Sequence, residues 1–176
     1  DYDIATTQTS WGLSGEVGLS PRADLTFGYE DFKDDAGKTR RDGSLGLAFA
    51  VNDQWMAEVG LATTDRTDPA AAANQVGSRT DLGARLTWTR DDDLKAWVFG
   101  HSTVDRSGGL ERNDRLGVGV ATRLSDRVTA EAEVSGGSLG TAGSAMLRWD
   151  NGAGTNYRLG YRRDPTRSLD STSFSG

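Results

Sequence analysis

A regular alternation of apolar and polar residues constrains this chain more than any other feature of its sequence. Alternating stretches begin at Leu13, Leu45, Leu82 and Leu116, and each ends in a short polar turn. The stretches recur about every 35 residues, and a second alternating stretch follows the turn within each repeat. Because a period of two is typical of strands and not of helices, the repeat predicts a series of β-hairpins.

The alternation predicts ten antiparallel strands, and nine of them have one clearly apolar face. The sixth, at 94–103, is ambiguous because Trp97 and Phe99 alternate with Ala96 and Val98, which are also apolar. The sequence leaves open which face of this strand is apolar.

The connections between the expected strands alternate in length. Short links are expected near 20–24, 52–54, 89–93, 125–127 and 150–156, and long polar links near 32–44, 62–81, 101–115 and 135–144. Short turns at one end and long loops at the other are typical of an outer-membrane β-barrel. No apolar run approaches the roughly 18 residues of a membrane-spanning helix, and a closed barrel is the other structure that lipid accommodates.

Aromatic residues gather next to the expected short turns. Tryptophan and tyrosine favour the interface between lipid and water, where an apolar ring and a polar edge are both accommodated. The sequence therefore predicts an interfacial aromatic belt made of Trp55, Trp88, Trp97, Trp149 and Tyr157. The alternative is that these rings cap the core of a soluble β-sandwich, whose strand ends also carry aromatics.

Three features favour a barrel over a soluble sheet. Glycines recur inside strands and suit tight curvature, charges recur in the middle of the polar faces, and no long crossover indicates a Greek key. Against the barrel, the apolar face is thin and rich in alanine. A soluble or surface-exposed β-sheet interaction module, such as an adhesin stalk, remains the alternative.

The residue types argue against enzymatic or metal chemistry. The one histidine, His101, precedes Ser102 and Asp105, but neighbours in an extended strand face opposite sides, so no catalytic residue is expected. The aspartates within 31–35 and 91–93 are interpreted as solvated turns, since calcium needs six to eight suitably spaced oxygens. Without cysteine the chain has no thiol site, so neither metal nor cofactor is expected. A net charge of −6 argues against nucleic acid as a partner.

The polar parity of the strands carries a set of charges that would line the lumen of a barrel. The expected lumen-facing residues are Glu16, Glu30, Glu58, Asp81, Arg85, Arg123, Glu131, Glu133, Arg148, Arg158 and Arg162. Acidic residues come mostly from the first eight strands and basic ones from the last two. Such charges either set the ion preference of a pore or form a lattice of salt bridges that fills a narrow lumen, and the sequence leaves both open.

The ends of the chain are expected to continue into further strands. The first clear strand, 11–19, runs into a short turn, whereas a complete barrel begins with a strand that leaves the periplasm. The last residues, 167–176, are polar and lack a terminal aromatic. We therefore expect residues 1–176 to be part of one outer-membrane barrel domain, an all-β up-and-down segment of at least ten strands with hairpin repeats over 9–164.

The punctuation of the hairpins carries a family resemblance. The turns LSPR at 19–22, VNDQ at 51–54 and LSDR at 124–127 each precede an alternating strand. In this respect the chain resembles the barrel regions of large proteobacterial outer-membrane proteins, of the porin or autotransporter-translocator type. The resemblance implies a location in the outer membrane of a Gram-negative bacterium, with lipid and further strands of the barrel as partners. It also implies a non-enzymatic role as a pore, or as an anchor or export conduit for attached surface domains.

Overall fold

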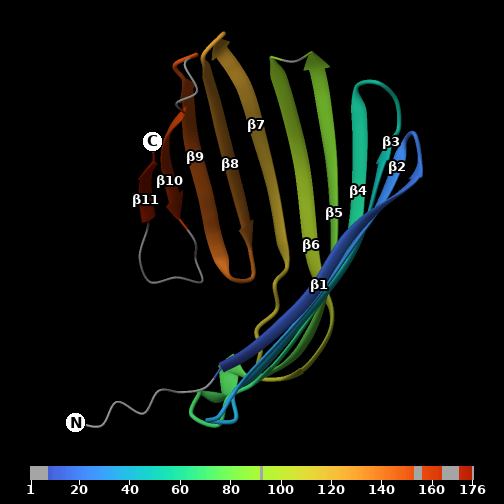
Figure 1. Cartoon of the computed structure of the whole chain (residues 1–176), viewed down its shortest axis with the longest axis vertical. Coiled ribbons are helices and arrows are strands. Elements are labelled where there is room, and N and C mark those ends of the chain that lie inside the picture. Colours follow the sequence, from blue (N-terminus) through green and yellow to red (C-terminus); the bar gives the residue numbers. More distant parts are fainter. Residues whose placement is uncertain (1–7, 92, 153–155, 164–170, 176) are drawn as a thin grey trace. The chain divides into compact units, whose positions relative to one another are not determined.

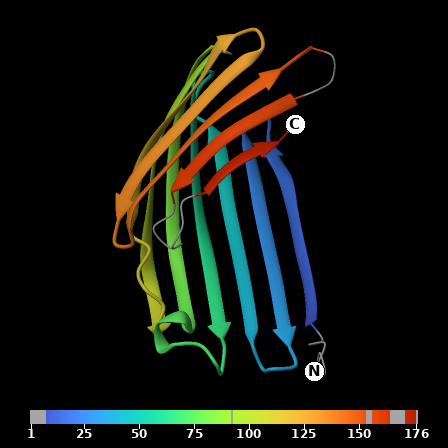
Figure 2. The same ribbon diagram turned by 90° about the vertical axis from the view of Figure 1, so that its left-hand side faces the viewer.

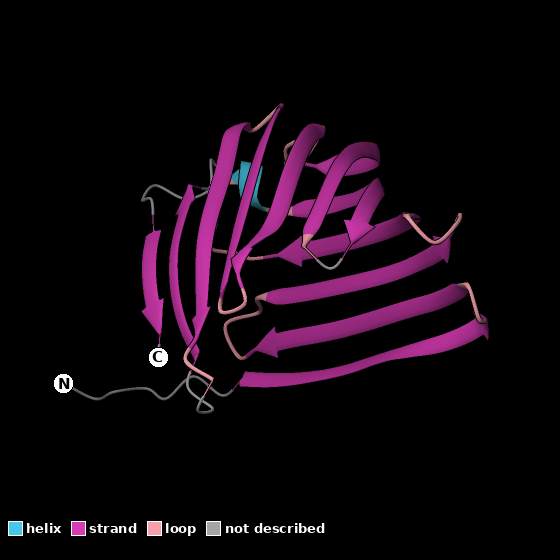
Figure 3. Cartoon of the chain, turned by 90° about the horizontal axis from the view of Figure 1, so that it is seen from above, coloured by secondary structure: helices cyan, strands magenta, loops and turns pink. Residues whose placement is uncertain are grey.

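The computed structural model describes residues 8–91, 93–152 and 156–163 with their side chains, and the backbone of 171–175. Eleven strands form one sheet in chain order (Figure 1). They are Gln8–Ser20 (β1), Ala23–Asp34 (β2), Thr39–Ala50 (β3), Trp55–Thr67 (β4), Gly77–Asp91 (β5), Leu94–Gly108 (β6), Arg115–Ser125 (β7), Val128–Gly137 (β8), Gly140–Asp150 (β9), Asn156–Arg163 (β10) and Ser171–Ser175 (β11). Within this part of the chain the single 3-10 turn Ala73–Gln75 (η1) is the only helical element (Figure 3).

Each strand pairs with the next along the chain, so the sheet is all-β and up-and-down, as the alternation predicts. The printed sequence predicts ten of these strands, and β11 is an additional one, antiparallel to β10. The hairpins from β7 to β10 are easiest to follow in Figure 2. Local turn chemistry fixes the link between β3 and β4: the Oδ1 atom of Asn52 accepts hydrogen bonds from the backbone amides of Gln54 and Trp55 at 2.9 and 3.0 Å.

The connections differ from the expected lengths because the strands continue beyond their apolar stretches. The link expected at 32–44 is the turn 35–38, in which Gly37 has a φ of 83°. The link expected at 135–144 is only residues 138–139, since Gly137 pairs with Gly140. Ladder hydrogen bonds use backbone groups alone. Polar residues can therefore extend a strand after the alternation of hydrophobicity has ended.

The chain divides into two compact units. Unit 1 contains Asp1–Phe49, Glu58–Gly83 and Ser102–Asn113, and unit 2 contains Ala50–Ala57, Ala84–His101 and Asp114–Gly176. Several strands contribute residues to both units.

Pairing between β6 and β7 settles the facing of the ambiguous sixth strand. Val98 lies opposite Val118, whereas Trp97 lies opposite Gly119. Because Val118 belongs to the apolar parity of β7, Ala96 and Val98 lie on the apolar face of the sheet. Trp97 and Phe99 therefore lie on the opposite face, which we call the polar face.

The described residues bury little apolar surface. Their buried hydrophobic side chains are Trp97, Phe99, Leu110 and Ala142. By contrast, Leu13 of unit 1 is 62% exposed and Leu116 of unit 2 is 66% exposed, both on the apolar face. Soluble monomers rarely expose large contiguous apolar patches. In the part of the chain that the structure describes, no helix is long and apolar enough to cross a membrane.

Candidate functional site: the polar face of the sheet

The predicted lumen-facing charges occupy one face of the sheet in each unit. In unit 1, Glu30 lies opposite Asp42, and Asp81 contacts Thr103. In unit 2 the register across β7, β8, β9 and β10 places Arg123, Thr129, Arg148 and Arg158 in one row. A second row in unit 2 runs through Trp97, Gly119, Glu133, Ser144 and Arg162. Strand alternation gives Glu16, Glu58, Arg85 and Glu131 the same face.

Unit 1 contains a lattice of paired charges on its polar face. Arg40 contacts the carboxylate of Asp42, and its Nη2 lies 3.3 Å from the Oε2 atom of Glu30. Thr64 of β4 donates to Asp42 at 2.8 Å. These contacts join β2, β3 and β4 through side chains, and they correspond to the salt-bridge lattice that the sequence leaves open.

Asp81 is the centre of a second network in unit 1. One carboxylate oxygen accepts a hydrogen bond from Thr103 at 2.7 Å, and the other lies 2.9 Å from the Nε atom of Arg79. Thr103 also accepts a 2.8 Å bond from the backbone amide of Asn113, and Arg79 donates to the carbonyl of Glu111 at 2.9 Å. Asp81 therefore acts through Arg79 and Thr103 to hold the connection at 109–113 against β5 and β6.

Replacing Asp81 with alanine is expected to release this connection. The substitution removes the partner of the buried Thr103 and of the half-buried Arg79, and a lost bond to a charged group costs about 1.5–3 kcal/mol. Amide hydrogen exchange should become faster at 109–113 in Asp81→Ala, while exchange in β8 and β9 stays unchanged. Equal exchange rates at 109–113 in the variant and the parent would show that other contacts hold the connection.

The polar face of unit 2 is organised around Trp97. Its indole Nε1 donates to the Oε2 atom of Glu133 at 3.0 Å, and the guanidinium of Arg85 lies 4.6 Å from the ring centroid. A Cβ atom on Gly119 would overlap the indole, so the ring lies directly over that glycine. Trp97 is 7% exposed, which makes it one of the best-packed side chains that the structure describes.

Phe99 makes a similar arrangement two residues further along β6. It lies over Gly117, and the guanidinium of Arg115 is 5.7 Å from its ring centroid. Arg115 also donates to the hydroxyl of Ser135 at 2.6 Å. The alternation of apolar and polar residues alone does not predict this cluster. Its signal is the position of two glycines on β7 directly opposite two aromatics on β6.

The aromatic belt requires one correction. Trp97 does not lie with Trp55, Trp88, Trp149 and Tyr157 on the apolar face, because its indole is on the polar face against Glu133. Trp149 and Tyr157 are cross-strand partners near the turn from β9 to β10, and their rings stack at 5.2 Å. The four other rings remain a belt by prediction.

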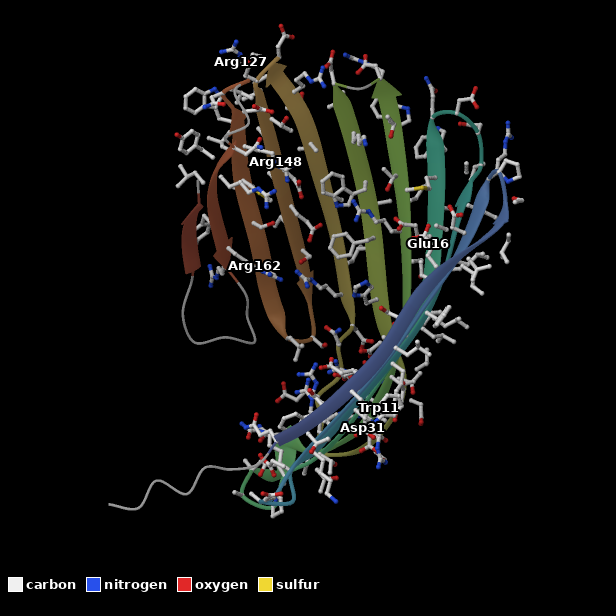
Figure 4. The ribbon with its side chains drawn as sticks, in the orientation of Figure 1. Trp11, Glu16, Asp31, Arg127, Arg148 and Arg162 are labelled. Atoms are coloured by element: carbon white, nitrogen blue, oxygen red, sulfur yellow. The ribbon has the colours of Figure 1, made fainter. Side chains whose placement is uncertain are left out.

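Unit 1 has an aromatic pair that lies far from the turn at 21–22, near the start of β1. The rings of Trp11 and Tyr29 lie 5.1 Å apart on the apolar face of β1 and β2. Asp31 is paired in register with Trp11, and both are labelled in Figure 4. The carboxylate of Asp31 also forms a 3.6 Å ion pair with Arg41. This pair lies outside the predicted belt, which contains only aromatic residues next to the expected short turns.

The other residues considered for catalysis or metal binding lie in ordinary strand and turn positions. His101 and Ser102 are consecutive in β6 and so face opposite sides. Arg90 donates to Asp91 at the exposed last residue of β5 and holds the pKa of that carboxyl below its ordinary value. Asp92 lies outside the described residues. Among the described residues no group of three or more histidine or acidic side chains could hold a metal ion.

One solved structure is similar in fold to this chain. A solved structure described as "KdgM porin in complex with disordered oligogalacturonate" matches with a TM-score of 0.55, covering 90% of this chain and 86% of that chain. The chain is similar in fold to this porin. Sequence identity to that porin is 9%, so the likeness concerns the fold alone. No protein-family model and no curated protein sequence matches the chain.

Proposed function

We propose that the chain spans the bacterial outer membrane as part of a β-barrel that forms a passive pore. The observation that carries this proposal is the exposure of its apolar face together with the porin fold. An apolar face that stays uncovered in the folded chain requires an apolar surrounding, and lipid supplies one. The partners of this face are then the outer-membrane lipids.

The length of the apolar stripe suits this assignment. On β1 the stripe runs from Trp11 to Leu19. This is about 27 Å along the strand at a rise of ~3.4 Å per residue. A strand tilt of about 40° reduces it to ~20 Å, close to the roughly 25 Å apolar band of outer-membrane barrels. In unit 1, Trp11 and Tyr29 would lie at a lipid–water interface. In unit 2, the belt of Trp55, Trp88, Trp149 and Tyr157 would lie at the periplasmic interface.

The polar face then lines the water-filled lumen. This assigns the eleven predicted charges, from Glu16 on β1 to Arg162 on β10, to the inside of the barrel. In unit 1 the described contacts favour a structural lattice that stiffens the wall. No step of this function involves a chemical reaction, so the proposed role is non-enzymatic.

The described residues give the two other functions less support. An anchor or export conduit for attached domains rests on the sequence resemblance to autotransporter barrels, and no contact in the described residues favours it. A soluble interaction module would need a covered apolar face, whereas Leu13 and Leu116 are more than half exposed.

Conductance across a planar lipid bilayer tests the proposed pore. The full-length protein that contains this chain, purified in detergent and added to one side, is expected to produce stepwise increases in current. An unrelated outer-membrane protein of closed lumen serves as the control for detergent leakage. Membrane-inserted protein that produces no steps would exclude the pore and leave the anchor.

A further inference from the structure

Three arginines on the polar face of unit 2 form a cluster of positive charge. Arg148 of β9 and Arg158 of β10 are direct cross-strand partners. Arg162 lies four residues beyond Arg158 on the same strand and therefore on the same face. Figure 4 shows Arg148 and Arg162 at successive levels of this face. We call Arg148, Arg158 and Arg162 the arginine cluster.

The arginine cluster is not neutralised by the part of the chain that the structure describes. No described acidic side chain lies within ion-pair distance of its members, all three of which are exposed. Glu133, on the neighbouring strand, instead accepts the hydrogen bond of Trp97. The positive charge of the cluster is thus open to solvent, in contrast to the paired charges of unit 1.

The direct pairing of two arginines opposes folding. Like charges directly opposite each other in an antiparallel sheet are destabilising. Residues that break a local rule in this way are expected at functional positions, where the lost stability is offset by binding. A bound anion would remove the repulsion between Arg148 and Arg158.

The geometry indicates the kind of anion. Guanidinium groups bind carboxylates and phosphates through two parallel hydrogen bonds. Cross-strand partners have Cβ atoms about 5 Å apart, so one oxyanion can contact both Arg148 and Arg158. Arg162 lies about 13 Å along β10 at ~3.3 Å per residue, which is the distance to another anionic group on an extended solute.

We propose that the arginine cluster is a binding site for extended solutes that carry several carboxylate or other oxyanion groups. This inference rests on one part of the proposed function, namely that the polar face lines a water-filled lumen, whether or not that lumen conducts across the membrane. It adds to that function a positively charged site, at which a polyanion that moves through the barrel would bind transiently. Neutral solutes would pass without binding there.

Calorimetric titration with hexaglutamate tests the site on the full-length protein in detergent at low salt. Hexaglutamate is expected to bind and hexaserine of the same length is not. The double variant Arg148→Gln/Arg158→Gln should bind hexaglutamate at least about tenfold more weakly, because two charge-assisted contacts are lost. The matched control Arg22→Gln/Arg127→Gln removes two exposed turn arginines and should bind as the parent does. Equal affinity of the parent and the double variant would overturn the proposal.

A second readout separates a binding role from a structural one. Without ligand, Arg158→Gln should unfold at a higher urea concentration than the parent, since repulsion from Arg148 is relieved. Unfolding at a lower concentration would mean that Arg158 neutralises an acid, and would overturn the site. Bilayer recordings keep the two proposals apart: hexaglutamate binding without current retains the site and excludes the pore, whereas current without binding retains the pore and excludes the site.

Discussion

Val118→Arg is expected to lower the stability of the membrane-inserted protein by about 2–4 kcal/mol, the penalty for an arginine facing lipid near the middle of the bilayer. Val118 lies on the apolar face of β7, is 53% exposed, and pairs with Val98 and Val134. In water, a substitution at so exposed a position would change stability by less than about 0.5 kcal/mol. Urea unfolding of protein refolded into phospholipid vesicles measures the difference.

Ala121→Arg supplies the matched control on the same strand. Ala121 lies on the polar face of β7, opposite Lys95 on one side and Glu131 on the other. An arginine there can pair with Glu131, so its unfolding midpoint should lie close to that of the parent. Similar losses for both variants would contradict the assignment of one face to lipid and the other to water.

Trp97→Ala is expected to lower the free energy of unfolding by about 3–5 kcal/mol, as for other large aromatics truncated in a packed site. The change removes the ring that covers Gly119, the bond to Glu133 and the contact with Arg85. A lipid-facing tryptophan at the interface would not give a loss of this size. The same vesicle unfolding experiment measures it through the four remaining tryptophans.

Trp97→Phe keeps an aromatic ring over Gly119 and removes the N–H donor to Glu133. Its loss should be about 1.5–3 kcal/mol, the contribution of a hydrogen bond to a charged group, here the half-buried carboxylate of Glu133. Quenching of tryptophan fluorescence by brominated lipid complements the unfolding measurement. In variants that keep one tryptophan each, the emission of Trp149 should be quenched and that of Trp97 should not. Strong quenching of Trp97 would contradict its place on the polar face.

The fold was predictable from the sequence because the alternation has a physical cause. Residues such as Leu13 and Val17 must share a face if the strand separates an apolar from a polar medium. This two-residue alternation can be read from the sequence of a single strand, whichever strands pair with it. The ends of the strands were not predictable. In the stretch 135–144 the backbone continues to pair after the side chains have stopped alternating, so composition predicts a loop where the structure has a two-residue turn.

The site was predictable in its placement but not in its contacts. Alternation puts Asp81 and Arg148 on the polar face, yet only the register shows that Asp81 holds Thr103 whereas Arg148 faces Arg158. Trp97 shows the limit most clearly. A tryptophan near a short turn is usually expected at the lipid–water interface. The Trp97 ring instead fills the space above Gly119 on the next strand, and this space exists only because the pairing of β6 with β7 brings the two residues together.

Membrane fractionation tests the central claim most directly. Cells producing the full-length protein that contains this chain are broken, and their membranes are washed with alkaline carbonate and probed with an antibody against this segment. The account predicts that the protein stays in the outer-membrane pellet and is released only by detergent. Release into the carbonate wash would contradict a spanning barrel and indicate a peripheral or secreted β-sheet protein.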